Sequence, residues 1–162
     1  GHRKIAYLGV DNSLVFSADR RNGYQLALTR HGIVPKPEYC VELPSITAGE
    51  DTPVHALLRS ASRPTAIVVS DDILALTLER ICTETGLSIP ADLSILSFNN
   101  SLFARLTSPQ LTSIDINSCQ LGIEAAAQMI SHIENPELPA TKILVPHQLI
   151  ERDSCARPVS HS

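Results

Sequence analysis

Short runs of apolar residues alternate along this chain with longer segments in which apolar residues recur every three or four positions. The clearest runs cover residues 4–9, 65–70 and 93–98, and each stops at a glycine or a polar residue. Continuous apolar runs of this length are typical of strands that are buried on both faces of a parallel sheet. Because helical segments separate them, the pattern predicts βαβ units with helices on both faces of the sheet.

The whole chain can be divided in this way, with no internal repeat. The expected strands are 4–9, 39–43, 65–70, 93–98, 111–114 and 142–150. The expected helices are 17–30, 52–60, 72–85 and 117–132. Asp71 and Asp72 open the third helix, and Gly86 is its expected stop signal. The predicted fold class is α/β, with a doubly wound, mostly parallel sheet.

Composition fits one ordinary globular domain of 162 residues, with 43% hydrophobic and 19% charged residues. The net charge of −4 argues against a nucleic-acid contact by this segment itself, because phosphate binding needs a basic patch. The apolar runs are too short to cross a membrane, and no secretory signal pattern opens the sequence. We therefore expect a cytoplasmic protein without a membrane contact.

The sequence shows neither a metal-ligand spacing nor a common catalytic motif. The four cysteines form no C-x-x-C pair, so we expect free thiols, and the six histidines form no H-x-x-x-H pair. There is no G-x-G-x-x-G, no phosphate-binding P-loop and no G-x-S-x-G nucleophile elbow. We predict no catalytic residues, no cofactor and no metal.

Polar side chains follow three of the expected strands. These are Asp11-Asn12-Ser13, Ser70-Asp71-Asp72 and Asn99-Asn100-Ser101. Ligands of doubly wound sheets bind at the carboxyl ends of the strands, where these groups would meet. Carboxylates, amides and the guanidinium of Arg20, in the helix after the first strand, match the paired donors and acceptors of a sugar.

Each of these residues also has a purely structural interpretation. Asp71 or Asp72 would serve as a helix cap, and Asn99-Asn100 as a turn pair. Arg20 would be a solvated helix residue. A binding site is favoured only because these residues are expected to meet at one edge of the sheet.

Several segments together resemble one family. They are Gly1-His2-Arg3-Lys4-Ile5-Ala6-Tyr7-Leu8-Gly9, Arg20-Arg21-Asn22-Gly23-Tyr24, Pro64-Thr65-Ala66-Ile67-Val68-Val69-Ser70-Asp71-Asp72, Ile89-Pro90-Ala91-Asp92-Leu93-Ser94-Ile95 and Leu111-Thr112-Ser113-Ile114. In this order they resemble the C-terminal part of the effector domain of lactose/galactose-repressor-type (LacI/GalR) regulators. The segment 97–101, Ser-Phe-Asn-Asn-Ser, resembles the maltose-operon repressor subgroup.

The resemblance implies a periplasmic-binding-protein-like lobe that senses a saccharide effector, with maltose or a relative as the expected ligand. Carried over by position, Arg20, Asp71 and Asn99 would contact the effector. Phe16 would add an apolar contact to a sugar face. An amide at Asn99, where many relatives have a carboxylate, would change which hydroxyls are preferred.

The resemblance also implies partners. Family members are allosteric homodimers that bind DNA through an N-terminal helix-turn-helix, which we expect to lie outside these 162 residues. Residues 52–60 and 72–85 are the candidate dimer helices. Residues 1–110 and 142–152 would form the C-terminal lobe of a partial effector-binding core. The strand and helix within 111–134 would belong to a first lobe and would lack their sheet here.

The missing first lobe would have two consequences. The apolar side of the helix near residues 117–134 should swap onto a neighbouring chain or fold back on its own lobe. The chain alone should bind sugar weakly or not at all, because half of the cleft would be missing. A sugar-binding protein of a transport system is the alternative interpretation, and a sugar-modifying enzyme is the third.

Overall fold

The computed structural model describes residues 1–10, 15–44 and 52–158. The strands found in these residues are β1 Ile5–Val10, β2 Cys40–Leu43, β3 Ala66–Val69, β4 Ser94–Phe98, β5 Thr112–Asp115 and β6 Gln148–Ile150. The helices are α1 Val15–Arg30, α2 Thr52–Arg59, α3 Asp72–Thr85, α4 Leu102–Leu106 and α5 Ser118–Glu134, with one turn of 3₁₀ helix at Pro37–Tyr39.

The strands form one sheet in the order β2-β1-β3-β4-β5-β6. All neighbours are parallel except β6, which runs antiparallel to β5. From β1 the chain passes to β2 on one side of β1. It then returns to β3 on the other side, and the later strands continue in that direction. This reversal confirms the predicted doubly wound class and makes the carboxyl edge of β1 and β3 the expected place for a ligand.

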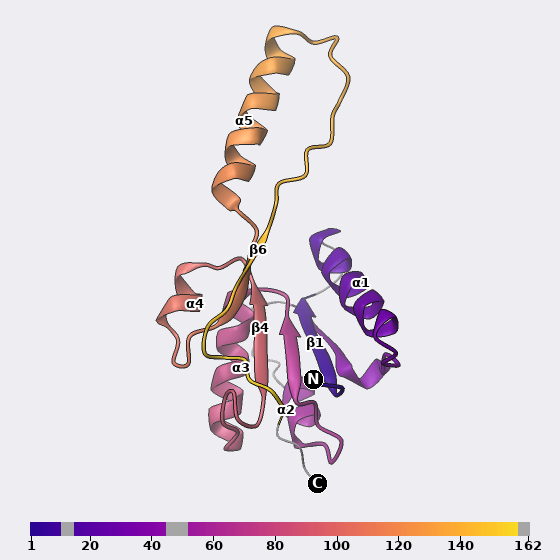
Figure 1. Cartoon of the computed structure of the whole chain (residues 1–162), viewed down its shortest axis with the longest axis vertical. Coiled ribbons are helices and arrows are strands. Elements are labelled where there is room, and N and C mark those ends of the chain that lie inside the picture. The colour runs from indigo at the N-terminus through magenta and orange to yellow at the C-terminus, as the bar shows by residue number, and fades with distance from the viewer. Residues whose placement is uncertain (11–14, 45–51, 159–162) are drawn as a thin grey trace.

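Helices cover both faces of the sheet (Figure 1). On one face, α2 and α3 pack over a core to which β3 contributes Ile67 and Val69. On the other face, Tyr24 and Leu28 of α1 pack with Tyr7 of β1, and the Tyr7 and Tyr24 rings stack at 5.5 Å between centroids.

Helix α3 has the ends that the sequence predicts. Asp71 is its N-cap, and its Oδ1 accepts a hydrogen bond from the backbone N–H of Leu74 at 2.9 Å. Gly86 closes the helix with a left-handed φ of +73°, a conformation that glycine adopts without steric cost.

Two element predictions were incomplete. Helix α4 and the 3₁₀ turn were not predicted, because elements this short carry no clear helical period. The strand predicted at 142–150 is confined to Gln148–Ile150, the residues that pair with β5. Residues 142–147 instead run back alongside α5, where the Thr141 hydroxyl donates to Gln128 Oε1 at 3.0 Å (Figure 1).

The expectation that residues 111–114 lack a sheet was wrong, since β5 pairs with β4 in the register Leu96↔Thr112. Helix α5 does leave the sheet and projects away from it (Figure 1). None of its residues is buried, so it does not fold back on its own lobe. The apolar side expected on this helix is exposed, as Met129 and Ile133 show.

Candidate functional site

Arg20 lies where three strands end. It sits in the second turn of α1, the helix that follows β1. Its guanidinium donates from Nη1 to the backbone carbonyl of Ser70, just after β3, and from Nη2 to Asn99 Oδ1 at 3.1 Å, just after β4. One side chain therefore ties together the carboxyl edge of the sheet, which we call the rim and define by Phe16, Arg20, Asp71 and Asn99.

Two aromatic rings flank that guanidinium. Its central carbon lies 5.1 Å from the ring centroid of Phe16 and 4.6 Å from that of Phe98. Both distances suit cation–π attraction. Phe16 is 46% exposed, which leaves apolar ring surface at the rim. Phe98 was not in the predicted set, although an aromatic residue directly before Asn99 was the available signal.

Partial burial of Arg20 makes the charged form of its guanidinium less favourable than in water. Burial lowers the pKa of its guanidinium, and the charges of Tyr7, Asp71 and Asp72 act in the opposite direction. An arginine nevertheless stays charged at neutral pH. The rim thus presents a fixed cation beside carboxylate oxygens, a set that can both donate to and accept from hydroxyl groups.

Asp71 combines a structural contact with a place at the rim. Besides capping α3 through Oδ1, its Oδ2 accepts from the Ser70 hydroxyl at 3.4 Å. The residue is 8% exposed. Capping was the structural interpretation of this residue, and it is confirmed, without removing the carboxylate from the rim.

Asn99 and Asn100 form a turn in which both residues have left-handed backbones, with φ of +98° and +46°. Asparagine tolerates this region better than most residues do. The turn is fixed by the N–H of Asn99, which donates to the carbonyl of Ile114 at 2.8 Å. The turn interpretation is therefore confirmed, and the same turn directs Asn99 Oδ1 to Arg20.

A buried carboxylate beneath the rim was missed in the sequence. Asp72 is 1% exposed and accepts three hydrogen bonds, from the hydroxyls of Ser97 and Ser113 and from the backbone N–H of Ser101. These partners belong to β4, β5 and the start of α4. The adjacent acidic pair was visible in the sequence, but nothing there indicated that only one carboxylate points inward.

Asp11, the remaining predicted group, lies outside the described residues. Of the four rim residues, Arg20 contacts Phe16 and Asn99 directly, and Asp71 follows the carbonyl to which Arg20 donates.

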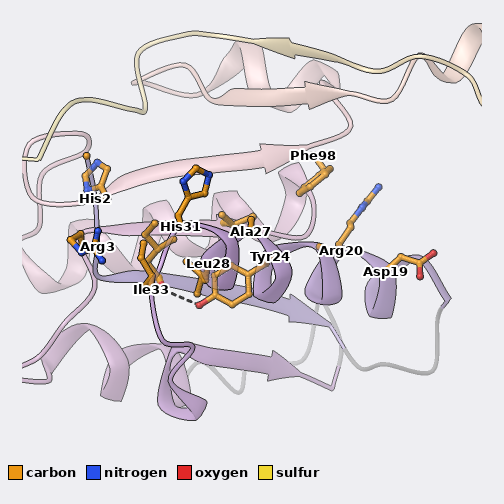
Figure 2. A pocket seen from close by; sticks show the side chains of 14 residues that line it. His2, Arg3, Asp19, Arg20, Tyr24, Ala27, Leu28, His31, Ile33 and Phe98 are labelled. Carbon is orange, nitrogen blue, oxygen red and sulfur yellow. Dashed lines mark hydrogen bonds between the residues drawn. The ribbon is translucent and has the colours of Figure 1, made fainter.

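A cavity of about 750 Å³ runs from the rim along α1 to the start of the chain (Figure 2). Arg20 and Phe98 line one end, and Gly1 and His2 line the other. Its middle is apolar, with Tyr24, Ala27, Leu28, Ile33 and Val68, so it offers few partners for a sugar. His2 is held by Thr65 Oγ1 and the carbonyl of Ala156, both at 2.9 Å, and has a structural role.

Within residues 1–10, 15–44 and 52–158, no group of three or more His, Cys, Asp or Glu side chains is arranged to hold a metal ion. In the same part of the chain, no helix is long and apolar enough to cross a membrane. The four cysteines are free, and Cys82 is a buried core residue.

Comparison with known proteins gives a consistent class. Residues 1–155 match the family described as periplasmic binding protein-like domain. The ribose operon repressor of Haemophilus influenzae is 33% identical over 136 residues, which are 84% of this chain and 41% of that protein. Catabolite control protein A of Priestia megaterium is 29% identical over 155 residues, or 95% of this chain and 47% of that protein.

A solved structure shows the same fold. The putative transcriptional regulator LacI from Bacillus cereus subsp. cytotoxis has a TM-score of 0.90 and 36% sequence identity, covering 96% of this chain and 55% of that chain.

The chain belongs to the family of periplasmic binding protein-like domains. Within that family it is the effector-domain type of LacI-family transcriptional regulators, the class of its relatives. Such regulators are not enzymes. The chain spans about half the length of the curated relatives it matches. None of the relatives named here is named for maltose, so that narrower assignment stays a prediction.

Proposed function

We propose that this chain is the effector-sensing lobe of a transcriptional repressor, and that its ligand is a saccharide, with maltose or a related sugar as the first candidate. The observation that carries the proposal is the bridge that Arg20 makes between Ser70 and Asn99. A guanidinium, an amide and the Asp71 carboxylate at one edge match the donors and acceptors of sugar hydroxyls. A relative that is named a ribose operon repressor supports the same ligand class.

The proposed mechanism is a shift between two arrangements of a dimer. The effector binds the rim of this lobe on one side and residues outside the 162 on the other. It thereby favours one relative position of the lobes, which changes how a helix-turn-helix elsewhere in the protein meets its operator. Helices α2 and α3 are the proposed dimer contact. A cytoplasmic location follows from this role.

The test is a thermal-shift screen of the full-length protein with maltose, maltotriose, ribose, cellobiose and glucose. A ligand that binds only the folded state at one hundred times its Kd stabilises that state by about 2.7 kcal/mol. The expected result is a rise in Tm with at least one of these sugars. The same sugar should change the affinity of the protein for operator DNA, measured by fluorescence anisotropy.

Failure of all five sugars to raise the Tm would contradict the saccharide proposal. Turnover of any of them by the full-length protein would contradict the regulator role.

A further inference from the structure

Asn100, the neighbour of the rim residue Asn99, makes hydrogen bonds in three directions. Its backbone N–H donates to the Ser113 hydroxyl at 3.0 Å, and its Nδ2 donates to Asp115 Oδ2 at 2.9 Å. Its Oδ1 accepts from the Nη2 of Arg152. Both polar atoms of the side chain are thus used, and each partner lies on a different segment.

One of these segments is where the chain leaves the sheet, and the other follows the strand by which the chain returns to it. Asp115 is the last residue of β5, and its Oδ1 accepts from the N–H of Asn117 at 2.7 Å, directly before α5. Arg152 follows β6 on the return path, and its Nη1 donates to the carbonyl of Leu111 at 2.7 Å. Figure 1 shows both paths passing through the same edge of the sheet on the way to and from α5.

The rim and these segments are joined through one turn. Arg20 holds Asn99 Oδ1, and Asn99 and Asn100 are consecutive left-handed residues. A change in the orientation of Asn99 would act directly on the peptide that it shares with Asn100, whose N–H donates to Ser113. The Asp72 carboxylate holds Ser113 and Ser101, and the backbone N–H groups of Asn99 and Asn100 are themselves hydrogen-bonded. A change at the rim would therefore reach Asp115 and Arg152 through the side chains of the two asparagines.

We propose that Asn100 is a positioning residue that couples the rim to the leaving and returning segments at Asp115 and Arg152. A ligand that hydrogen-bonds to Arg20 or Asn99 in place of their bond to each other would alter the hydrogen bonds of Asn100 with Asp115 and Arg152. This idea rests on the proposed function only in taking the rim to be the ligand site.

The coupling can be tested without any sugar, by carbon-detected NMR titration of the Asp115 carboxyl in the 162-residue chain. The hydrogen bond from Asn100 is the main cause that lowers the pKa of Asp115, followed by the bond from the backbone of Asn117. Asn100→Gly keeps the backbone N–H and accepts φ of +46° without strain, so it removes only the side chain. We expect the pKa of Asp115 to rise in this variant.

The decisive variants change Arg20, the rim residue from which the proposed coupling starts. Arg20→Gln should also raise the pKa of Asp115, and should add nothing when combined with Asn100→Gly. Arg20→Lys keeps the charge but loses the two-pronged contact, so it should raise this pKa too. Arg21→Gln is the matched control, because it removes the same charge from a neighbour that pairs with Glu42 instead. It should leave the pKa of Asp115 unchanged.

An unchanged Asp115 pKa in Asn100→Gly, in Arg20→Gln or in Arg20→Lys would overturn the coupling, provided the variant has the wild-type Tm. An equal rise in Arg21→Gln would overturn it as well, because charge alone would then be the cause. If Arg20→Gln fails to fold, the pKa in Arg20→Lys decides. Since no sugar is used, a protein that ignores every sugar would refute the proposed function and leave this result standing.

Discussion

At the residue scale, the neighbouring carboxylates of Asp71 and Asp72 have different structural roles at the proposed site. The first caps α3 and stays at the rim, whereas the second is turned inward and accepts hydrogen bonds from three elements. A buried carboxylate is stable only when its lone pairs are satisfied. Asp72 therefore holds together the ends of β4 and β5 on which the rim is built.

Replacing Asp72 by alanine should lower the free energy of unfolding by about 2–4 kcal/mol, because the donors of Ser97, Ser113 and Ser101 lose their acceptor. Asp72→Asn should cost less, since an amide can accept from Ser101 and donate to the serine hydroxyls. Urea denaturation measures both. Asp153→Ala, at an exposed carboxylate, is the control. Equal stability of Asp72→Ala and wild type would contradict the proposed role.

Glu79 of α3 should make stability depend on pH. Burial raises its pKa to about 7, and its Oε1 has no hydrogen-bond partner. Because the folded-state pKa is raised, folding favours the protonated form. Its contribution to stability is greatest below the unfolded pKa near 4.5 and is lost as the pH rises towards 7.

Glu79→Gln should remove this dependence and be more stable than wild type at pH 8, by about 1–2 kcal/mol after allowance for solvent screening. Urea unfolding at pH 5 and pH 8 measures the difference. Glu134→Gln, exposed at the end of α5, should leave the dependence intact. The same pH dependence in Glu79→Gln and in wild type would contradict the assignment.

The sequence predicts which side chains reach the rim better than it predicts how they are held. Arg20, Asp71 and Asn99 could be placed because strand exits and helix starts are readable from the pattern. The contacts of Phe98, Asp72 and Asn100 could not, because they depend on the left-handed turn at residues 99 and 100 and on which way single side chains point. Neither the left-handed turn nor the direction of a single side chain produces a periodic pattern in the sequence.

At the scale of elements, most of the strands and the helices α1 and α3 follow from the sequence because each buries an apolar surface. The exceptions are the segment 142–150 and helix α5. The predicted strand at 142–150 has an apolar stretch at residues 143–145, but Pro146 has no N–H to donate to a neighbouring strand. In addition, β5 ends at Asp115 and pairs with only three residues of this segment. Helix α5 has the apolar pattern of a buried helix and no buried residue.

We expect α5 to mediate self-association of the 162-residue chain. Ile133 is 72% exposed and Met129 is 66% exposed, and an uncovered apolar side of this kind favours contact with another copy. Sedimentation velocity should show a concentration-dependent dimer that the double variant Met129→Glu, Ile133→Glu abolishes. Leu26→Glu, at an exposed leucine of α1, should leave the dimer intact. A monomer at all concentrations would contradict this expectation.

At the scale of the whole molecule, we expect the rim to form only one wall of the proposed binding site. Ligand pockets bury most of the surface of a small ligand, and one edge of a single sheet cannot do so. The chain spans about half the length of its curated relatives, so a second wall is expected from outside the 162 residues.

The 162-residue chain should therefore bind saccharides at least about tenfold more weakly than the full-length protein, a loss of about 1.4 kcal/mol. Calorimetric titration of both proteins with the sugar that gives the largest thermal shift compares them. Equal affinities would place the complete site within this chain and would contradict the two-wall interpretation.

Arg20 is the residue proposed to recognise a saccharide at the rim. The most direct test is calorimetric titration of the full-length protein with that sugar, in wild type, Arg20→Gln and Arg21→Gln. We expect Arg21→Gln to bind as wild type does and Arg20→Gln to lose at least about tenfold in affinity, the scale of a hydrogen bond to a charged group. Undiminished binding by Arg20→Gln would contradict this proposal.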